Sequence, residues 1–112
     1  MTKIWLDDNR PAPDGWLWVK TAQEAIDAII KYKPTHISLD NDLGIISEVG
    51  EGYHVAQFIE QGAYYKQIQP MHMTVHTQNY PRGRQMVAAL QKAIDYWDGQ
   101  GTVVKTPFQS GL

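Results

Sequence analysis

The sequence contains no cysteine, which excludes disulfides, thiolate metal sites and cysteine nucleophiles together. It also lacks an apolar run near the roughly 20 residues that a membrane-spanning helix needs. Acidic residues appear at positions 7 and 8, too early for a secretory signal. Neither sign of charge dominates, since 10 Lys and Arg stand against 12 Asp and Glu, and this argues against binding duplex DNA through a basic surface. We therefore expect a cytoplasmic protein with no membrane contact. The charge balance does not exclude binding of a small phosphorylated ligand.

What the sequence does contain is typical of one globular domain. Hydrophobic residues make up 43% of the 112 residues and charged residues 20%, so the chain can build a hydrophobic core without disulfide or metal cross-links. No repeat, low-complexity tract or linker divides it. We treat residues 1–112 as a single domain.

Short apolar stretches alternate with helical patterns along the chain. Strands are predicted at residues 3–6, 16–19, 35–39, 71–75 and 102–104. Helices are predicted from the capping-box pattern at residues 21–24 to Pro34, from Gly52 to near Gly62, and from about Arg82 to Trp97. Residues 9–15 contain two prolines and a glycine and are expected to form a loop. Strands that alternate with helices in this way are typical of βαβ units in a parallel α/β sheet.

The principal strands run into polar residues at their carboxyl ends, which are Asp7–Asp8, Asp40, His76–Thr77 and Lys105. In open parallel sheets, ligands bind outside the carboxyl ends of the strands. This coincidence is the strongest functional signal in the sequence.

Four carboxylates, those of Asp7, Asp8, Asp40 and Asp42, are expected to reach this edge of the sheet. Like charges gathered in one crevice repel each other unless a cation lies among them. Mg²⁺ prefers hard oxygen ligands, usually one or two carboxylates with waters and phosphate oxygens. The sequence therefore predicts a site for Mg²⁺ (or Mn²⁺), whereas an isolated acid pair would more simply be a solvated turn or helix cap.

Two further residues near this edge have roles that the sequence leaves open. His76 can act as a general acid or base, or it can be a buried histidine hydrogen-bonded to backbone. Arg10 can hold a phosphate bidentately, or it can pair with a neighbouring carboxylate. His36 and His72 fall in the middle of strands, and the sequence assigns them no chemistry.

The predicted strands alternate between apolar and polar residues. A parallel sheet covered on both faces has continuous apolar runs in its strands, so we expect helices mainly on one face. The other face carries Trp5, His36, Ser38, His72 and Thr74. We expect the segment from Asn9 to Trp16, or a second copy of the chain in a homodimer, to cover this half-polar face, because an exposed Trp on a flat face favours association.

Asp7–Asp8, Asp40, Thr77 and Lys105, in this order and each at a strand end, resemble the receiver domain of two-component signalling. The resemblance extends over nearly the whole chain. It implies a flavodoxin-like sheet of order 2-1-3-4-5, a metal at the acids, a phosphoryl group accepted by the central Asp, and phosphate contacts from the Thr and the Lys. The usual first and last receiver helices are absent from the expected fold.

Residues 6–11 (LDDNRP), 39–44 (LDNDLG) and 75–79 (VHTQN) resemble a divergent branch, the cyclic-phosphate-processing receiver-like domain. Asn41 stands where that branch usually has His, and Thr77 keeps the hydroxyl of its Ser. The resemblance implies metal-dependent hydrolysis of a cyclic phosphate, as on an RNA end or a nucleotide. Catalytic roles are expected for Asp40 and His76, and phosphate contacts for Arg10, Thr77, Asn79 and Lys105. The alternatives are a stand-alone receiver phosphorylated on Asp40 and an inactive receiver-like interaction module.

Overall fold

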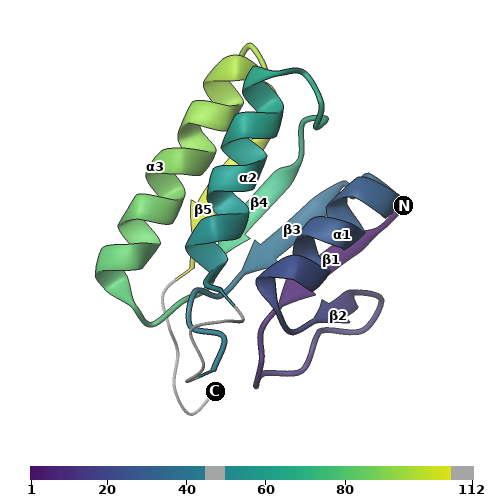
Figure 1. The fold of residues 1–112 in the computed structure, drawn as a ribbon, viewed down its shortest axis with the longest axis vertical. Coiled ribbons are helices and arrows are strands. Elements are labelled where there is room, and N and C mark those ends of the chain that lie inside the picture. Colours follow the sequence, from purple (N-terminus) through teal and green to yellow (C-terminus); the bar gives the residue numbers. More distant parts are fainter. Residues whose placement is uncertain (45–49, 107–112) are drawn as a thin grey trace.

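The structure is a computed structural model that describes residues 1–44 and 50–106 (Figure 1). Its elements are β1 (Lys3–Leu6), β2 (Leu17–Val19), α1 (Ala22–Tyr32), β3 (His36–Leu39), α2 (Gly52–Tyr64), β4 (His72–Val75), α3 (Tyr80–Tyr96) and β5 (Thr102–Lys105). The strands pair in parallel in the order β2-β1-β3-β4-β5, which confirms the expected receiver-like sheet. No helix in these two ranges is both long and apolar enough to cross a membrane.

The ends of several elements differ from the sequence-based expectation. α3 begins at Tyr80 instead of Arg82, because the side chain of Asn79 caps its first turn and a proline follows at position 81. β5 extends to Lys105, while Trp16 lies outside β2. Most of the expected loop between Gly44 and Gly52, and the stretch beyond Phe108 where no helix was expected, fall outside the described residues.

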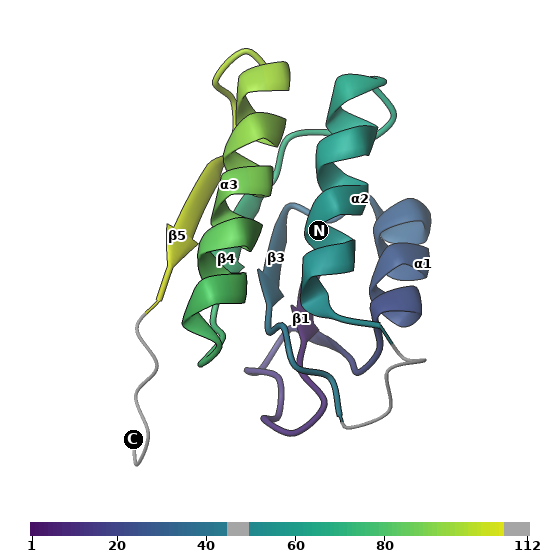
Figure 2. The ribbon, with the colours of Figure 1, turned by 60° about the vertical axis from the view of Figure 1, so that its left-hand side comes forward.

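All three helices lie side by side on the same face of the sheet (Figure 2). Crossovers between parallel strands are right-handed, so the direction of each step across the sheet decides which face its connection covers. The steps from β2 to β3, from β3 to β4 and from β4 to β5 run in one direction. The step from β1 to β2 runs in the opposite direction, and its connection, residues 7–16, therefore crosses the face that has no helix.

The hydrophobic core lies between the helices and the sheet. Strand residues that point toward the helices are almost fully buried: Ile4, Leu6, Ile37, Leu39, Met73 and Val75. They pack against buried side chains of α2 and α3, which are Val55, Ile59, Met86 and Leu90. Each such side chain contributes about 1.5–3 kcal/mol through burial, so this layer fixes the strand ends that carry the candidate site.

The segment of residues 7–16 covers part of the half-polar face. The indole of Trp5 donates a hydrogen bond to the carbonyl of Arg10 (2.9 Å), and Trp16 packs edge-on against Trp5 with ring centroids 6.3 Å apart. Trp16 also contacts His36, whereas His72 of the next strand is exposed. Coverage by a second copy of the chain stays a prediction.

Gly52 is expected to be intolerant of any side chain. The backbone there passes against the carbonyl of Asp40, and a Cβ would overlap that oxygen. We expect Gly52→Ala to lower the free energy of unfolding by roughly 2–3 kcal/mol, because packed backbone has to move. Gly83→Ala is the matched control, since its Cβ would mainly meet the movable end of Lys105, and we expect a change within about 1 kcal/mol. Equal stability of the two variants in urea denaturation would contradict this packing.

Candidate functional site

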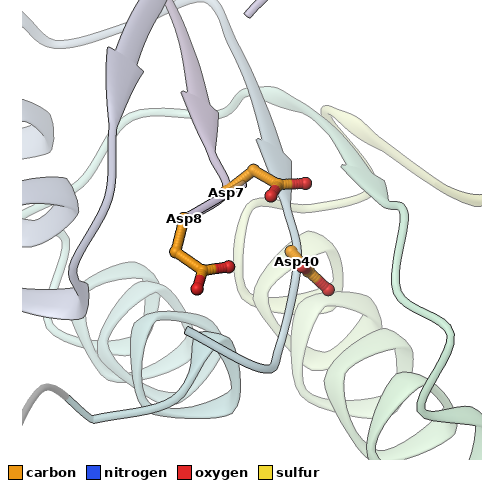
Figure 3. Close-up of side chains that lie close together, drawn as sticks. All are labelled: Asp7, Asp8 and Asp40. Atoms are coloured by element: carbon orange, nitrogen blue, oxygen red, sulfur yellow. The ribbon is translucent and has the colours of Figure 1, made fainter. Parts of the chain in front are cut away.

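Three carboxylates converge at the carboxyl ends of β1 and β3, as Figure 3 shows. One oxygen from each of Asp7, Asp8 and Asp40 lies within 4.8 Å of the others. Asp7 and Asp40 are buried, and Asp8 is exposed. The three acids line an open pocket of about 300 Å³, together with Asn9, Arg10, Asp42 and Gln78. The expected meeting of acids at this edge therefore holds for three of the four, with Asp42 in the pocket wall but outside the three-carboxylate cluster.

Asp7 is the most constrained of these acids. One of its oxygens accepts the backbone N–H groups of Asn9 (2.9 Å) and Arg10 (2.8 Å). The other accepts Nε of Arg10 (2.8 Å) and lies 3.2 Å from Nε2 of His76. Burial alone would raise the pKa of Asp7, but the hydrogen bond from His76, the two backbone N–H groups and the charge of Arg10 lower that pKa to about 2. Asp7 is thus negatively charged at neutral pH.

Asp40 has the opposite electrostatic balance. Its burial, and next the negative charge of Asp7, raise the pKa of Asp40 above its usual value. Hydrogen bonds from the backbone N–H of Asn41 and from the side chain of Thr77 compensate only in part. A cation close to both carboxylates would remove the repulsion between them, so the charge distribution of this edge fits a positive ligand.

The donor set fits Mg²⁺ or Mn²⁺ by its chemistry. It offers hard carboxylate oxygens from two strand ends, with Asp8 on the exposed side toward the open pocket. Mg²⁺ keeps several waters and binds one or two carboxylates together with phosphate oxygens, which needs such an open side. Asp7, Asp8 and Asp40 are the residues that could hold the ion.

Arg10 connects the two strand ends. Its guanidinium donates to the backbone carbonyl of His76 (2.8 Å) and lies 3.5 Å from a carboxylate oxygen of Asp40, in addition to its contact with Asp7. The pairing of Arg10 with a neighbouring carboxylate, one of the two roles that the sequence left open, is therefore present. The same side chain is 36% exposed and lines the pocket, so it is also placed to contact an anion there.

His76 contacts the carboxylate of Asp7 from inside the protein and does not line the pocket. Its Nδ1 lies 2.6 Å from the hydroxyl of Ser38 and its Nε2 faces Asp7, while Trp5 stacks on the ring at 4.0 Å. Serine, histidine and aspartate thus follow one another as in a hydrolase triad. However, Ser38 is only 3% exposed, so its hydroxyl cannot reach a substrate. Of the two alternatives for His76, the structure shows the buried one, with side-chain partners in place of backbone.

Of the four expected phosphate contacts, only Arg10 lines the pocket. Thr77 is fully buried next to Asp40, and its hydroxyl oxygen accepts the backbone N–H of Asn79 (3.1 Å). Lys105 directs its ammonium over the ring of Tyr80, 4.4 Å from the centroid. The cation thus lies against an aromatic face, and the expected phosphate role of Lys105 stays a prediction.

Asn79 and Asn41 instead shape the loops around Asp42. The side-chain oxygen of Asn79 accepts the backbone N–H of Arg82 as the cap of α3, and its amide donates to Asp42 (3.3 Å). Asn41 is fully buried and donates to Asp42 and to Glu51 (3.0 Å each). Asn41, which stands where the branch that the sequence resembles usually has His, therefore links Asp42 to Glu51 at the start of α2.

The sequence reasoning missed several residues of the site. Trp5, Ser38 and Thr74 share one face by strand register, and His76 follows two residues after Thr74. The contacts of Trp5 and Ser38 with His76 could therefore have been inferred. The indole of Trp18 donates to the backbone carbonyl of Asp7 (2.6 Å), which no local pattern indicated. Gln78 lines the pocket and had no signal beyond its place in a motif.

Asp7 and Asp40 should respond in opposite ways to loss of charge. Asp7→Asn removes a carboxylate whose pKa is about 2, against about 3.9 when unfolded, and should lower the free energy of unfolding at pH 7 by roughly 2 kcal/mol. Asp40→Asn removes a carboxylate whose pKa is raised, so the stability should stay equal or increase. Denaturation in the presence of a chelator measures both, and similar losses would contradict the assignment.

The difference between wild type and Asp7→Asn should also depend on pH. A lowered pKa in the folded state means that the carboxylate stabilises the fold above the unfolded pKa near 3.9. This contribution should be lost as the pH falls from about 4 through about 2. Denaturation curves across this window should converge for the two proteins, and a constant difference would show that the charge of Asp7 is not its cause.

Two comparisons with known proteins gave matches. Residues 2–92 match the family described as "Cyclic-phosphate processing Receiver domain", a range that includes every candidate site residue except Lys105. A similar solved structure is the signal receiver domain of a protein described as a Luxo repressor, from Vibrio parahaemolyticus. It is 19% identical, with a TM-score of 0.58 over 96% of this chain and 79% of that chain, and at this identity it shows the shared fold alone. Comparison with curated proteins gave no match. Because the family match spans most of the sequence, the chain belongs to the Cyclic-phosphate processing Receiver domain family.

Proposed function

We propose that this chain is a metal-dependent hydrolase of a cyclic phosphate, such as one on an RNA end or a nucleotide. The observation that carries the proposal is the convergence of Asp7, Asp8 and Asp40 beside Arg10 in an open pocket of about 300 Å³. The lining offers four carboxylates against one guanidinium, so a phosphodiester anion would be repelled without a divalent cation. The same electrostatics that support a metal site therefore support a metal-dependent reaction.

The charged residues that line the pocket have different roles in the proposed reaction. Asp7, Asp8 and Asp40 would hold Mg²⁺ or Mn²⁺, whose chemistry is to polarise the phosphoryl oxygens. Arg10 contacts a non-bridging oxygen of the phosphate with its charge. Asp42, the pocket carboxylate outside the cluster, accepts a proton from the attacking water. The new bond joins that water oxygen to phosphorus, and the bond from phosphorus to one ring oxygen breaks. That ring oxygen takes a proton from solvent water, and Asp42 later returns its own proton to solvent.

His76 enters this proposal as a positioning residue. Both its ring nitrogens have partners inside the protein, and one of these partners is Asp7. A direct proton transfer to substrate, which the sequence suggested, would need a ring nitrogen that faces the pocket. We expect His76→Ala to lower turnover through misplacement of Asp7 while the limbs of the pH–rate profile stay unchanged. Loss of a limb near neutral pH would restore the catalytic role.

Asp8→Asn tests the proposed hydrolase activity with least risk to the fold, because Asp8 is exposed. We expect it to weaken Mg²⁺ binding and to reduce turnover of a cyclic nucleotide phosphate by roughly 10²-fold or more, since it removes a charged ligand. Asp14→Asn is the matched control, as this exposed acid lies outside the pocket lining. The test is a screen of cyclic and linear nucleotide phosphates with Mg²⁺ or Mn²⁺. Equal turnover in both variants would refute the role of the acid cluster.

Metal binding can be followed separately by tryptophan fluorescence. Trp18 donates to the carbonyl of Asp7, and Trp5 stacks on the histidine that contacts Asp7, so two indoles report on this site. A Mg²⁺ titration should change the emission of wild type and of Asp14→Asn, and much less that of Asp8→Asn. No response in any variant would favour the inactive interaction module.

The hydrogen bond from the Thr77 side chain to Asp40 favours a second candidate, a stand-alone receiver. In that case a carboxylate oxygen of Asp40 attacks the phosphorus of acetyl phosphate, acetate leaves, and an acyl phosphate forms. Wild type would then be labelled and Asp40→Asn would not, since an amide cannot form this product. Stable labelling without turnover of any cyclic phosphate would replace the hydrolase proposal with this one.

A further inference from the structure

A second group of metal-ligating side chains lies on the half-polar face of the sheet, at the opposite ends of the strands. His36 of β3 and His72 of β4 are direct partners across the parallel pair, and their ring centroids are 5.0 Å apart. They precede Asp40 and His76 by four residues each. At about 3.3 Å per residue, this places the pair on the order of 13 Å from the acid cluster.

The hydrogen bonds of the two rings involve Nδ1. In His36 this atom lies 2.9 Å from the hydroxyl of Thr35, and in His72 it lies 3.0 Å from the hydroxyl of Thr102. The hydroxyl of Thr35 also lies 3.4 Å from the carbonyl of Thr2, to which it can donate its own proton while it accepts Nδ1–H of His36. In that tautomer His36 carries its lone pair on Nε2.

A histidine whose Nδ1–H is held by an oxygen acceptor has the arrangement that metal-binding histidines show in proteins. The outer hydrogen bond fixes the ring orientation and makes Nε2 the ligand. For His72, Thr102 lies on β5, on the side away from His36. This directs the remaining ring nitrogen of His72 outward and toward β3.

We propose that His36 and His72 form a two-histidine site for a divalent transition cation of the Zn²⁺, Cu²⁺ or Ni²⁺ class, bound through both Nε2 atoms. Zn–N bonds of about 2.0–2.1 Å with tetrahedral angles put the centroids of two imidazoles about 5 Å apart. The observed separation of 5.0 Å is compatible with two ligands of one ion. β3 and β4 lie inside the sheet, with neighbours on both sides, so the backbone holds the two rings at this distance.

The charges around the pair set its affinity. Burial lowers the pKa of His36, and the neighbouring His72 and Lys3 lower it further, so His36 is in the neutral form that binds metals. Lys3 is the direct partner of His36 on β1 and repels a cation at the same time. Removal of the Lys3 charge should therefore tighten metal binding, which provides a test with a gain of affinity.

This site and the acid cluster differ in their preferred ions. Nitrogen donors suit Zn²⁺, Cu²⁺ and Ni²⁺, whereas carboxylate oxygens suit Mg²⁺. An excess of Mg²⁺ should therefore occupy the acids and leave the histidine pair to the transition metal. The inference does not depend on the proposed hydrolase activity, and either can fail alone.

The test is calorimetric titration of the full chain with Zn²⁺ in excess Mg²⁺. His72→Gln changes the exposed member of the pair and should weaken Zn²⁺ binding by roughly tenfold or more. His54→Gln is the matched control, because His54 is also exposed and Gln suits its capping-box position at the start of α2. Lys3→Met should tighten binding several-fold. Equal Zn²⁺ affinity in wild type and His72→Gln would overturn the proposal.

A second measurement locates the ion directly. In NMR spectra of the wild-type protein with excess Mg²⁺, substoichiometric Ni²⁺ should broaden the ring resonances of His36 and His72 first. Early broadening of His54 or His76 in their place would refute the site. This readout needs no variant, so a folding defect cannot obscure it.

Discussion

The right-handed crossover of parallel strands decides which connecting segments cover each face of the sheet. Three successive connections run the same way across the sheet and put their helices on one face. The single step in the other direction, from β1 to β2, sends residues 7–16 across the second face. The same constraint therefore carries Arg10 over the strand ends, lays Trp16 against the half-polar face, and leaves His72 exposed.

Within this frame, Asp7 joins the parts of the candidate site. Its carboxylate receives hydrogen bonds from its own loop, from Arg10 and from His76, so β1, the 7–16 segment and β4 meet at one charge. The charge that these donors stabilise in turn raises the pKa of Asp40. The protein thus stabilises the charged form of Asp7 and destabilises the charged form of Asp40. A divalent cation near both would offset the repulsion between the two carboxylates.

The sequence predicted the parallel sheet and the meeting of acids, because these depend on local patterns, and the resemblance to receiver domains implied the order of the strands. Apolar alternation tells which face of a strand is buried, and parallel pairing brings strand ends to one edge. It did not predict that Lys105 lies over Tyr80 or that Ser38 and Asp7 hold His76, because side-chain rotamers and packing across three strands determine these contacts. The capping role of Asn79 was readable, since Asn followed shortly by Pro is typical of a helix start.

Three histidines share the half-polar face, and their hydrogen-bond partners separate their roles. At His76, a negative carboxylate on one nitrogen and a hydroxyl on the other use both sites of the ring, so the imidazole becomes a support for Asp7. At His36 and His72, the side-chain hydrogen bonds involve threonine hydroxyls at Nδ1. Where such a hydroxyl accepts Nδ1–H, the lone pair belongs to Nε2, which is the condition for a metal ligand. The residue beside each histidine, more than its place on the sheet, therefore decides whether the ring positions another side chain or binds an ion.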